Sequence, residues 1–185
     1  MERDFKGVLW GQFGASIQML ENAIDACPDD VWSDPSRRPE WPDNDVVGFW
    51  YLVFHTLFWL DFYLSNQREE EFSPPAPFTT EEFAPEGLLP ERPYTKDELR
   101  PYLEHCRRKC RTAIAALDDR DAFEREVPSR PGMSVAELFL YNMRHVQHHT
   151  AQLNLILRQR ASSPPPNWVS KPKEPLREGS SESPA

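Results

Sequence analysis

The sequence predicts an all-α protein whose simplest architecture is a four-helix bundle. Four segments repeat apolar residues at helical spacing, and two of them open with capping-box patterns. No segment alternates polar and apolar residues over the length of a strand. Proline concentrates outside these segments, with six residues in 66–93 and six in 161–185. We therefore expect a helical bundle domain over residues 1–160 and a tail over residues 161–185.

The first two helices are predicted from apolar patterns of different kinds. Residues 4–26 carry one apolar stripe at spacings of three and four, and the pattern ends before Pro28. Residues 44–65 are apolar on nearly every face. Because such a helix is buried on every side, we expect its outer face to meet a second subunit in a homodimer. His55 and Asp61 interrupt the apolar run, so we do not expect this helix to span a membrane.

The last two helices are predicted from their first turns. Residues 95–117 begin with a Thr-x-x-Glu capping box, but Pro101 follows so soon that we expect either a kink or a later beginning. Residues 134–160 begin with a Ser-x-x-Glu capping box directly after a Pro-Gly pair and a methionine.

A long acidic connection separates the second helix from the third. Residues 66–93 hold seven Glu and two Arg. Connections of this length are typically functional lids or disordered segments. We expect a partly ordered cover over one end of the bundle, and a mobile, solvated loop is the alternative. The apolar side chains that this cover would use for packing are Phe72, Phe78, Phe83, Leu88 and Leu89.

The rest of the composition excludes several classes of protein. With 30 acidic and 21 basic residues and a net charge of −9, the chain lacks the clustered basic surface of a nucleic-acid-binding protein. Its first residues mix both signs of charge, which is not typical of a secretory signal. Three cysteines (Cys27, Cys106 and Cys110) fit a reducing compartment, so we expect a cytoplasmic protein. The Pro/Ser-rich tail has too few apolar residues to offset its ordering entropy and is expected to be disordered, with Trp168 touching the body.

Histidines interrupt the apolar stripes of two predicted helices. His145 and His149 lie one turn apart on the core-facing line of the fourth helix, and His55 lies among aromatic residues of the second. Two facing helices of this kind can converge three imidazoles on one point. Neutral imidazole is a common ligand for Zn, Ni, Cu and Fe(II), and three protein ligands leave positions open for water or substrate. The pattern predicts a metal site, and histidines that bind no metal are the alternative.

The pattern of these histidines resembles that of the DinB/YfiT-like superfamily of four-helix bundles. Its members have one His in the second helix and an H-x-x-H-H-x-x-Q-L run in the last. Here His55 matches the first, and the run from His145 through His148, His149 and Gln152 to Leu153 matches the second. The resemblance covers about residues 4–160. It implies an up-down-down-up bundle with a long connection between the second and third helices, and frequent dimers.

The resemblance also implies a site and a class of activity. The metal ligands would be His55, His145 and His149, with Gln152 and His148 beside the bound cofactor. The metal would be Zn or Ni, with Fe or Mn as alternatives. Because some relatives are mycothiol-dependent isomerases or bacillithiol S-transferases, the resemblance implies a metal-dependent enzyme that acts on small molecules, with a low-molecular-weight thiol as partner. A non-catalytic bundle that binds a metal or small ligand and acts as an interaction module is the alternative.

Overall fold

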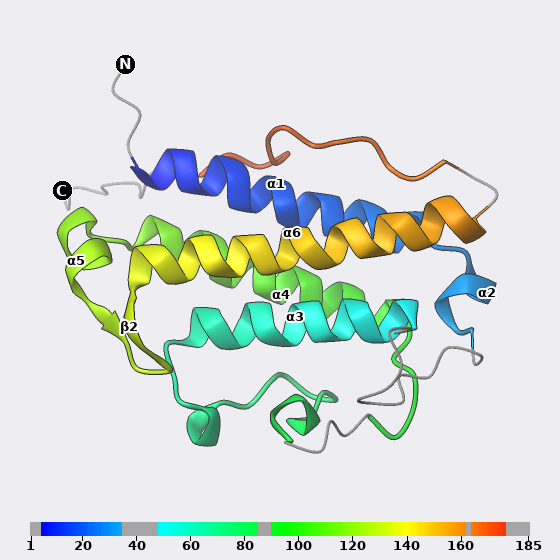
Figure 1. The fold of residues 1–185 in the computed structure, drawn as a ribbon, viewed down its shortest axis with the longest axis horizontal. Helices are drawn as coiled ribbons and strands as arrows, with labels where there is room; N and C mark the ends of the chain where they lie inside the picture. The colour runs from blue at the N-terminus through cyan, green and yellow to red at the C-terminus, as the bar shows by residue number, and fades with distance from the viewer. Residues whose placement is uncertain (1–4, 35–47, 85–89, 162–163, 177–185) are drawn as a thin grey trace, which may run out of the picture.

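Four long helices form the protein body in the computed structural model, which describes residues 5–34, 48–84, 90–161 and 164–176. They are α1 (Phe5–Ala26), α3 (Phe49–Ser65), α4 (Lys96–Ala115) and α6 (Val135–Arg160). Helices α1 and α6 run in one direction and α3 and α4 in the other, so the topology is up-down-down-up (Figure 1). Both α1 and α3 pack against α4 and against α6. The predicted all-α bundle is confirmed, while the first residues of two predicted helices (4 and 44–47) lie outside the described residues.

Short elements that the sequence did not predict connect the long helices. A single turn, α2 (Asp29–Trp32), follows α1, and α5 (Asp119–Glu124) follows α4. A hairpin of β1 (Glu126–Val127) and β2 (Arg130–Ser134) then leads into α6. No pattern in the sequence indicates this hairpin, because strands of two and five residues are too short to show an alternating pattern. Val127 anchors the hairpin, since its side chain is 1% exposed.

Both predicted capping boxes are present at the helix starts. Thr95 accepts a hydrogen bond from the Glu98 backbone N–H, and the Glu98 carboxylate accepts one from the Thr95 backbone N–H. Ser134 caps α6 in the same reciprocal way. The later beginning considered for α4 is wrong, because Pro101 lies inside this helix at an exposed position. Two orphan backbone donors at each start are satisfied by this arrangement.

The connection between α3 and α4 runs along the side of α3 (Figure 1). It contains two short 3-10 turns, η1 (Glu69–Glu71) and η2 (Glu81–Phe83). Phe72 and Phe78 are buried, and the Phe83 ring lies 4.9 Å from those of Phe58 and Phe62 in α3. The prediction of a cover over one end of the bundle is therefore wrong, because the connection packs along the side of α3. Two of the residues expected to pack, Leu88 and Leu89, lie outside the described residues.

This path of the connection explains why α3 is apolar on nearly every face. The outer aromatic face, which predicted a second subunit, is covered by the chain itself. The homodimer remains a prediction, but the apolar outer face of α3 no longer supports it. Asp61, a charge within α3, is buried and forms an ion pair of 2.5 Å with Lys109 of α4. No helix among the described residues is long and apolar enough to cross a membrane.

Part of the predicted disordered tail lies along α1 (Figure 1). Within residues 164–176, the Glu174 carbonyl accepts a hydrogen bond of 2.8 Å from the Trp10 indole. Pro172 approaches Gly14 so closely that a Cβ there would lie 2.9 Å from the proline ring. Trp168, which was expected to touch the body, is 72% exposed. Because proline restricts the unfolded chain, ordering this proline-rich segment costs less conformational entropy than its polar composition indicates.

Candidate metal centre

Helices α3 and α6 bring the three predicted histidines together. His55 comes from the middle of α3, and His145 and His149 come from consecutive turns of α6. Each offers one ring nitrogen, and these three nitrogens all lie within 4.8 Å of one another. The ring centroids are 4.5 to 5.3 Å apart. The juxtaposition depends on the packing of α3 against α6, which brings together His55 and His145 although they are 90 residues apart in sequence.

The spacing of these nitrogens fits a single metal ion. The Nε2 atoms of His55 and His145 are 3.4 Å apart. In a tetrahedral site with zinc–nitrogen bonds of about 2.0–2.1 Å, two ligand nitrogens lie about 3.3–3.4 Å apart. His55 and His145 therefore already have the separation that a shared ion requires.

Hydrogen bonds to Nδ1 of His55 and of His149 determine which ring nitrogen is free to bind a metal ion. His55 Nδ1 lies 2.7 Å from Glu82 Oε2, and His149 Nδ1 lies 2.7 Å from Gln152 Oε1. A carboxylate and an amide oxygen only accept hydrogen bonds, so Nδ1 is the donor in both rings. Nε2 then carries the lone pair. Metal-binding histidines are held in the same way, since the second ring nitrogen donates to a carboxylate or carbonyl oxygen.

The electrostatic surroundings keep two of the imidazoles neutral. Burial, with His149 and His55 nearby, lowers the pKa of His145 to about 2. Burial and the neighbouring His55 lower the pKa of His149 to about 4. A metal ion binds the neutral form of imidazole. Protons therefore do not compete for these two ligands near neutral pH.

Glu82 is the residue of this centre that the sequence did not single out. It lies in η2 of the connection, and its side chain is only 4% exposed. Its Oε2 atom also accepts a hydrogen bond of 2.9 Å from the Trp59 indole. Although burial raises the pKa of Glu82, the hydrogen bonds from His55, Tyr51 and Trp59 hold it below its ordinary value. Glu82 is one of seven glutamates in the connection, and nothing in its local sequence distinguishes it from the others.

The two other predicted residues lie at the rim of the centre. Gln152 is exposed and orients His149. His148 is exposed, and its ring lies 5.0 Å from that of His149. The His55 side chain is 26% exposed, so the centre is accessible from solvent. The arrangement therefore combines three converging nitrogens with an open side that a small molecule can reach.

Two tyrosines extend the line of imidazoles between α3 and α6. Tyr141 lies one turn before His145, and its ring packs against Tyr63 of α3 at 5.4 Å. The Tyr63 ring is 6.2 Å from that of His145.

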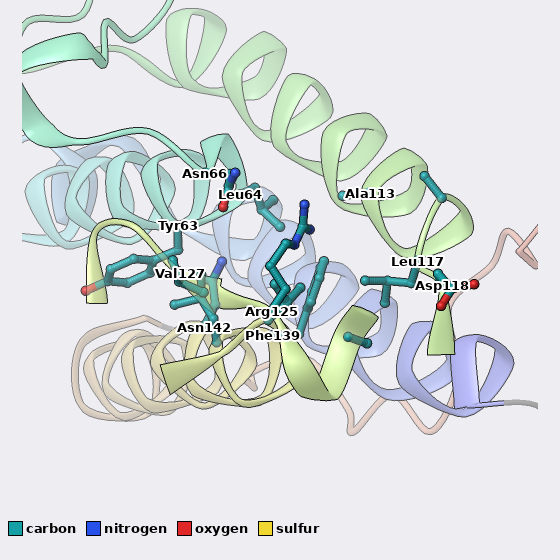
Figure 2. Close-up of a pocket in the computed structure, with 14 residues that line it drawn as sticks. Tyr63, Leu64, Asn66, Ala113, Leu117, Asp118, Arg125, Val127, Phe139 and Asn142 are labelled. Carbon is teal, nitrogen blue, oxygen red and sulfur yellow. The ribbon is translucent and has the colours of Figure 1, made fainter. Parts of the chain in front are cut away.

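Tyr63 also borders a cavity of about 370 Å³ at the end of the bundle, where Arg125, Val127 and Asn142 contribute to the wall (Figure 2). No imidazole lines this cavity, so it is separate from the histidine cluster.

Comparison with known proteins identifies one family. The family model of the DinB superfamily matches residues 12–153. The match begins within α1, ends within α6 and contains all three converging histidines. No curated protein and no solved structure matches the chain significantly.

Proposed function

Because this chain belongs to the DinB superfamily, we propose that it binds one divalent transition metal at His55, His145 and His149. We further propose that it is a metal-dependent enzyme acting on small molecules. The observation that carries the proposal is the convergence of three imidazole nitrogens within 4.8 Å. Zn and Ni are the proposed metals, because imidazole nitrogen suits both ions.

The residues around the centre have distinct roles in this function. His55, His145 and His149 hold the ion, and Glu82 and Gln152 orient two of the rings through Nδ1. Three protein ligands leave coordination positions for a small molecule on the accessible side. The metal supplies Lewis acidity and lowers the pKa of a coordinated water or thiol. The Trp59 indole donates a hydrogen bond to the Glu82 carboxylate, which is buried and is therefore held in place beside His55.

A low-molecular-weight thiol is the proposed cosubstrate. The proposal is supported by the resemblance of the H-x-x-H-H-x-x-Q-L run to that of thiol-dependent enzymes and by the affinity of Zn and related ions for thiolate sulfur. The three cysteines of this chain are buried, so none of them is placed to act as the thiol at an accessible centre. Burial raises the pKa of Cys106 and of Cys110, which keeps both as unreactive thiols.

Metal content and metal spectroscopy test the proposal. We expect one metal ion per wild-type chain by inductively coupled plasma mass spectrometry. The His149→Ala variant should lose it, whereas the matched His148→Ala variant should retain it. Cobalt(II) should then substitute for the native ion, and cysteine or 2-mercaptoethanol should produce a sulfur-to-cobalt charge-transfer band. If wild-type chain takes up no ion from a panel of divalent metals, the site is wrong. If metal binds but neither thiol nor water exchanges on it, the protein binds metal without catalysis.

A further inference from the structure

Arg130 lies beside the row of tyrosines and histidines, and no carboxylate of the described residues pairs with it. Its guanidinium carbon lies 5.3 Å from the ring centroid of Tyr63 and 5.3 Å from that of Tyr141. Nη2 donates a hydrogen bond of 2.8 Å to the Tyr63 hydroxyl. Among the described residues, no Asp or Glu forms an ion pair with Arg130. Seven other arginines do have such partners (Arg92, Arg100, Arg107, Arg108, Arg111, Arg120 and Arg160).

The hairpin holds this guanidinium in a fixed position. Arg130 is the first residue of β2, and it pairs with Val127, whose side chain is buried. The strand ends at Ser134, the capping residue of α6, so a few residues connect Arg130 to the helix that carries His145. Stacking on two aromatic rings restricts the side chain further. The cation is therefore preorganised, which reduces the entropy cost of binding a ligand.

Arg130 has more hydrogen-bond donors than the described residues use. A guanidinium has five N–H donors, and among the described residues its acceptor is the Tyr63 hydroxyl. Arg130 is half-buried, and a partly desolvated cation without a counter-charge gains most from binding an anion. Its planar fork matches a carboxylate or phosphate in a two-point hydrogen bond.

Arg130 lies close to the proposed metal centre. Tyr63 contacts Arg130 with its hydroxyl, while its ring packs edge-on against His145 at 6.2 Å. Tyr141, whose ring the guanidinium also faces, precedes His145 by one turn of α6. Arg130 thus lies one aromatic ring away from a proposed metal ligand.

We propose that Arg130, with the Tyr63 and Tyr141 rings that hold it, binds an anionic group of the substrate while another atom of the same molecule reaches the metal. This inference rests on the proposed function and names its substrate class: small molecules with a carboxylate or phosphate group. The anion would accept two N–H donors of the guanidinium. Neutral small molecules would lose this interaction and bind more weakly.

Matched thiols test this inference without an activity assay. Cobalt(II)-loaded protein is titrated with 2-mercaptoethanol, which is neutral, and with a series of mercaptocarboxylates of increasing chain length, and the charge-transfer band is recorded. For the best-fitting mercaptocarboxylate, Arg130→Gln should lower the affinity about tenfold, as expected for a charge-assisted hydrogen bond. The affinity for 2-mercaptoethanol should not change. Arg125→Gln, an exposed arginine near the same hairpin, is the control and should change neither affinity.

The outcomes separate this inference from the proposed function. If Arg130→Gln changes the affinities for all thiols equally, or changes none, the anion site is wrong while the metal centre stands. If no thiol binds cobalt, the proposed thiol chemistry fails, and inorganic phosphate then decides the anion site in metal-free protein. Phosphate should raise the melting temperature of wild-type chain and of Arg125→Gln, and should have no effect on Arg130→Gln. An equal effect on all three proteins would overturn the anion site.

Discussion

Glu82 allows a test of whether the connection contributes to the metal centre. The change is Glu82→Gln, which keeps the size of the side chain and removes its charge. The carboxylate is 2.7 Å from His55 Nδ1 and its side chain is 4% exposed, so little water screens the pair. Loss of the charge makes His55 a weaker donor of its Nε2 lone pair and allows its ring to reorient.

The expected magnitude follows from this geometry. Mutations of groups that hydrogen-bond a metal ligand typically lower metal affinity about 10–100-fold. Because glutamine keeps an oxygen that can accept from Nδ1, we expect the lower end, about tenfold, which corresponds to about 1.4 kcal/mol. Glu82→Ala removes the acceptor as well and should approach the upper end.

Competition with a chromophoric chelator measures the zinc affinity of each variant. Glu81→Gln is the matched control, because Glu81 precedes Glu82 in the same 3-10 turn but bonds the Thr79 hydroxyl instead of a histidine. Its zinc affinity should equal that of wild type. An affinity of Glu82→Gln within twofold of wild type would refute the role of this carboxylate, and so would an equal loss in Glu81→Gln.

Three further predictions concern stability. Asp61→Ala should lower the free energy of unfolding in urea by about 2 kcal/mol, because it leaves the buried Tyr102 hydroxyl without its acceptor and Lys109 without its ion pair; a loss below about 1 kcal/mol would contradict this. Trp10→Phe should lose the hydrogen bond to Glu174, so in a chain that ends at residue 163 the same substitution should cost about 1 kcal/mol less than in the full chain. In metal-free protein, His145 and His149 have folded-state pKa values below the unfolded value of 6.5, so the unfolded chain binds more protons. Stability should therefore fall as the pH decreases from about 6.5 towards 4, and His149→Gln should flatten this dependence in urea titrations at several pH values.

The helices and the histidine cluster were predictable because their signals are local or repeat regularly. The spacing of His145 and His149 places both on one face whatever the rest of the fold does. His55 required a second step, since its approach to them depends on two apolar stripes facing each other. The capping boxes at Thr95 and Ser134 fixed where α4 and α6 begin. Each of these inferences uses residues at most a few turns apart or a stripe that extends along a helix.

The roles of Glu82 and Arg130 could not be predicted from the sequence. Each reaches its position through a segment with no regular pattern, one in the connection and one in a hairpin of very short strands. Their surroundings in sequence resemble those of the other glutamates and arginines. Only the path of the backbone distinguishes them, and that path depends on contacts far away in the chain, such as the packing of Phe83 on α3.

The aromatic surface of α3 links the position of Glu82 to the way in which the core is closed. An all-round apolar helix predicts that something covers its outer face, but it does not tell whether the cover is a second subunit or the chain itself. In this protein the connection covers it, and Phe83 packs on Phe58 and Phe62 directly beside Glu82. The same contacts that bury the aromatic face therefore bring a carboxylate to His55 Nδ1. The long connection thus couples closure of the core to the orientation of a proposed metal ligand, which gives a physical reason for its length and for its mixture of aromatic and acidic residues.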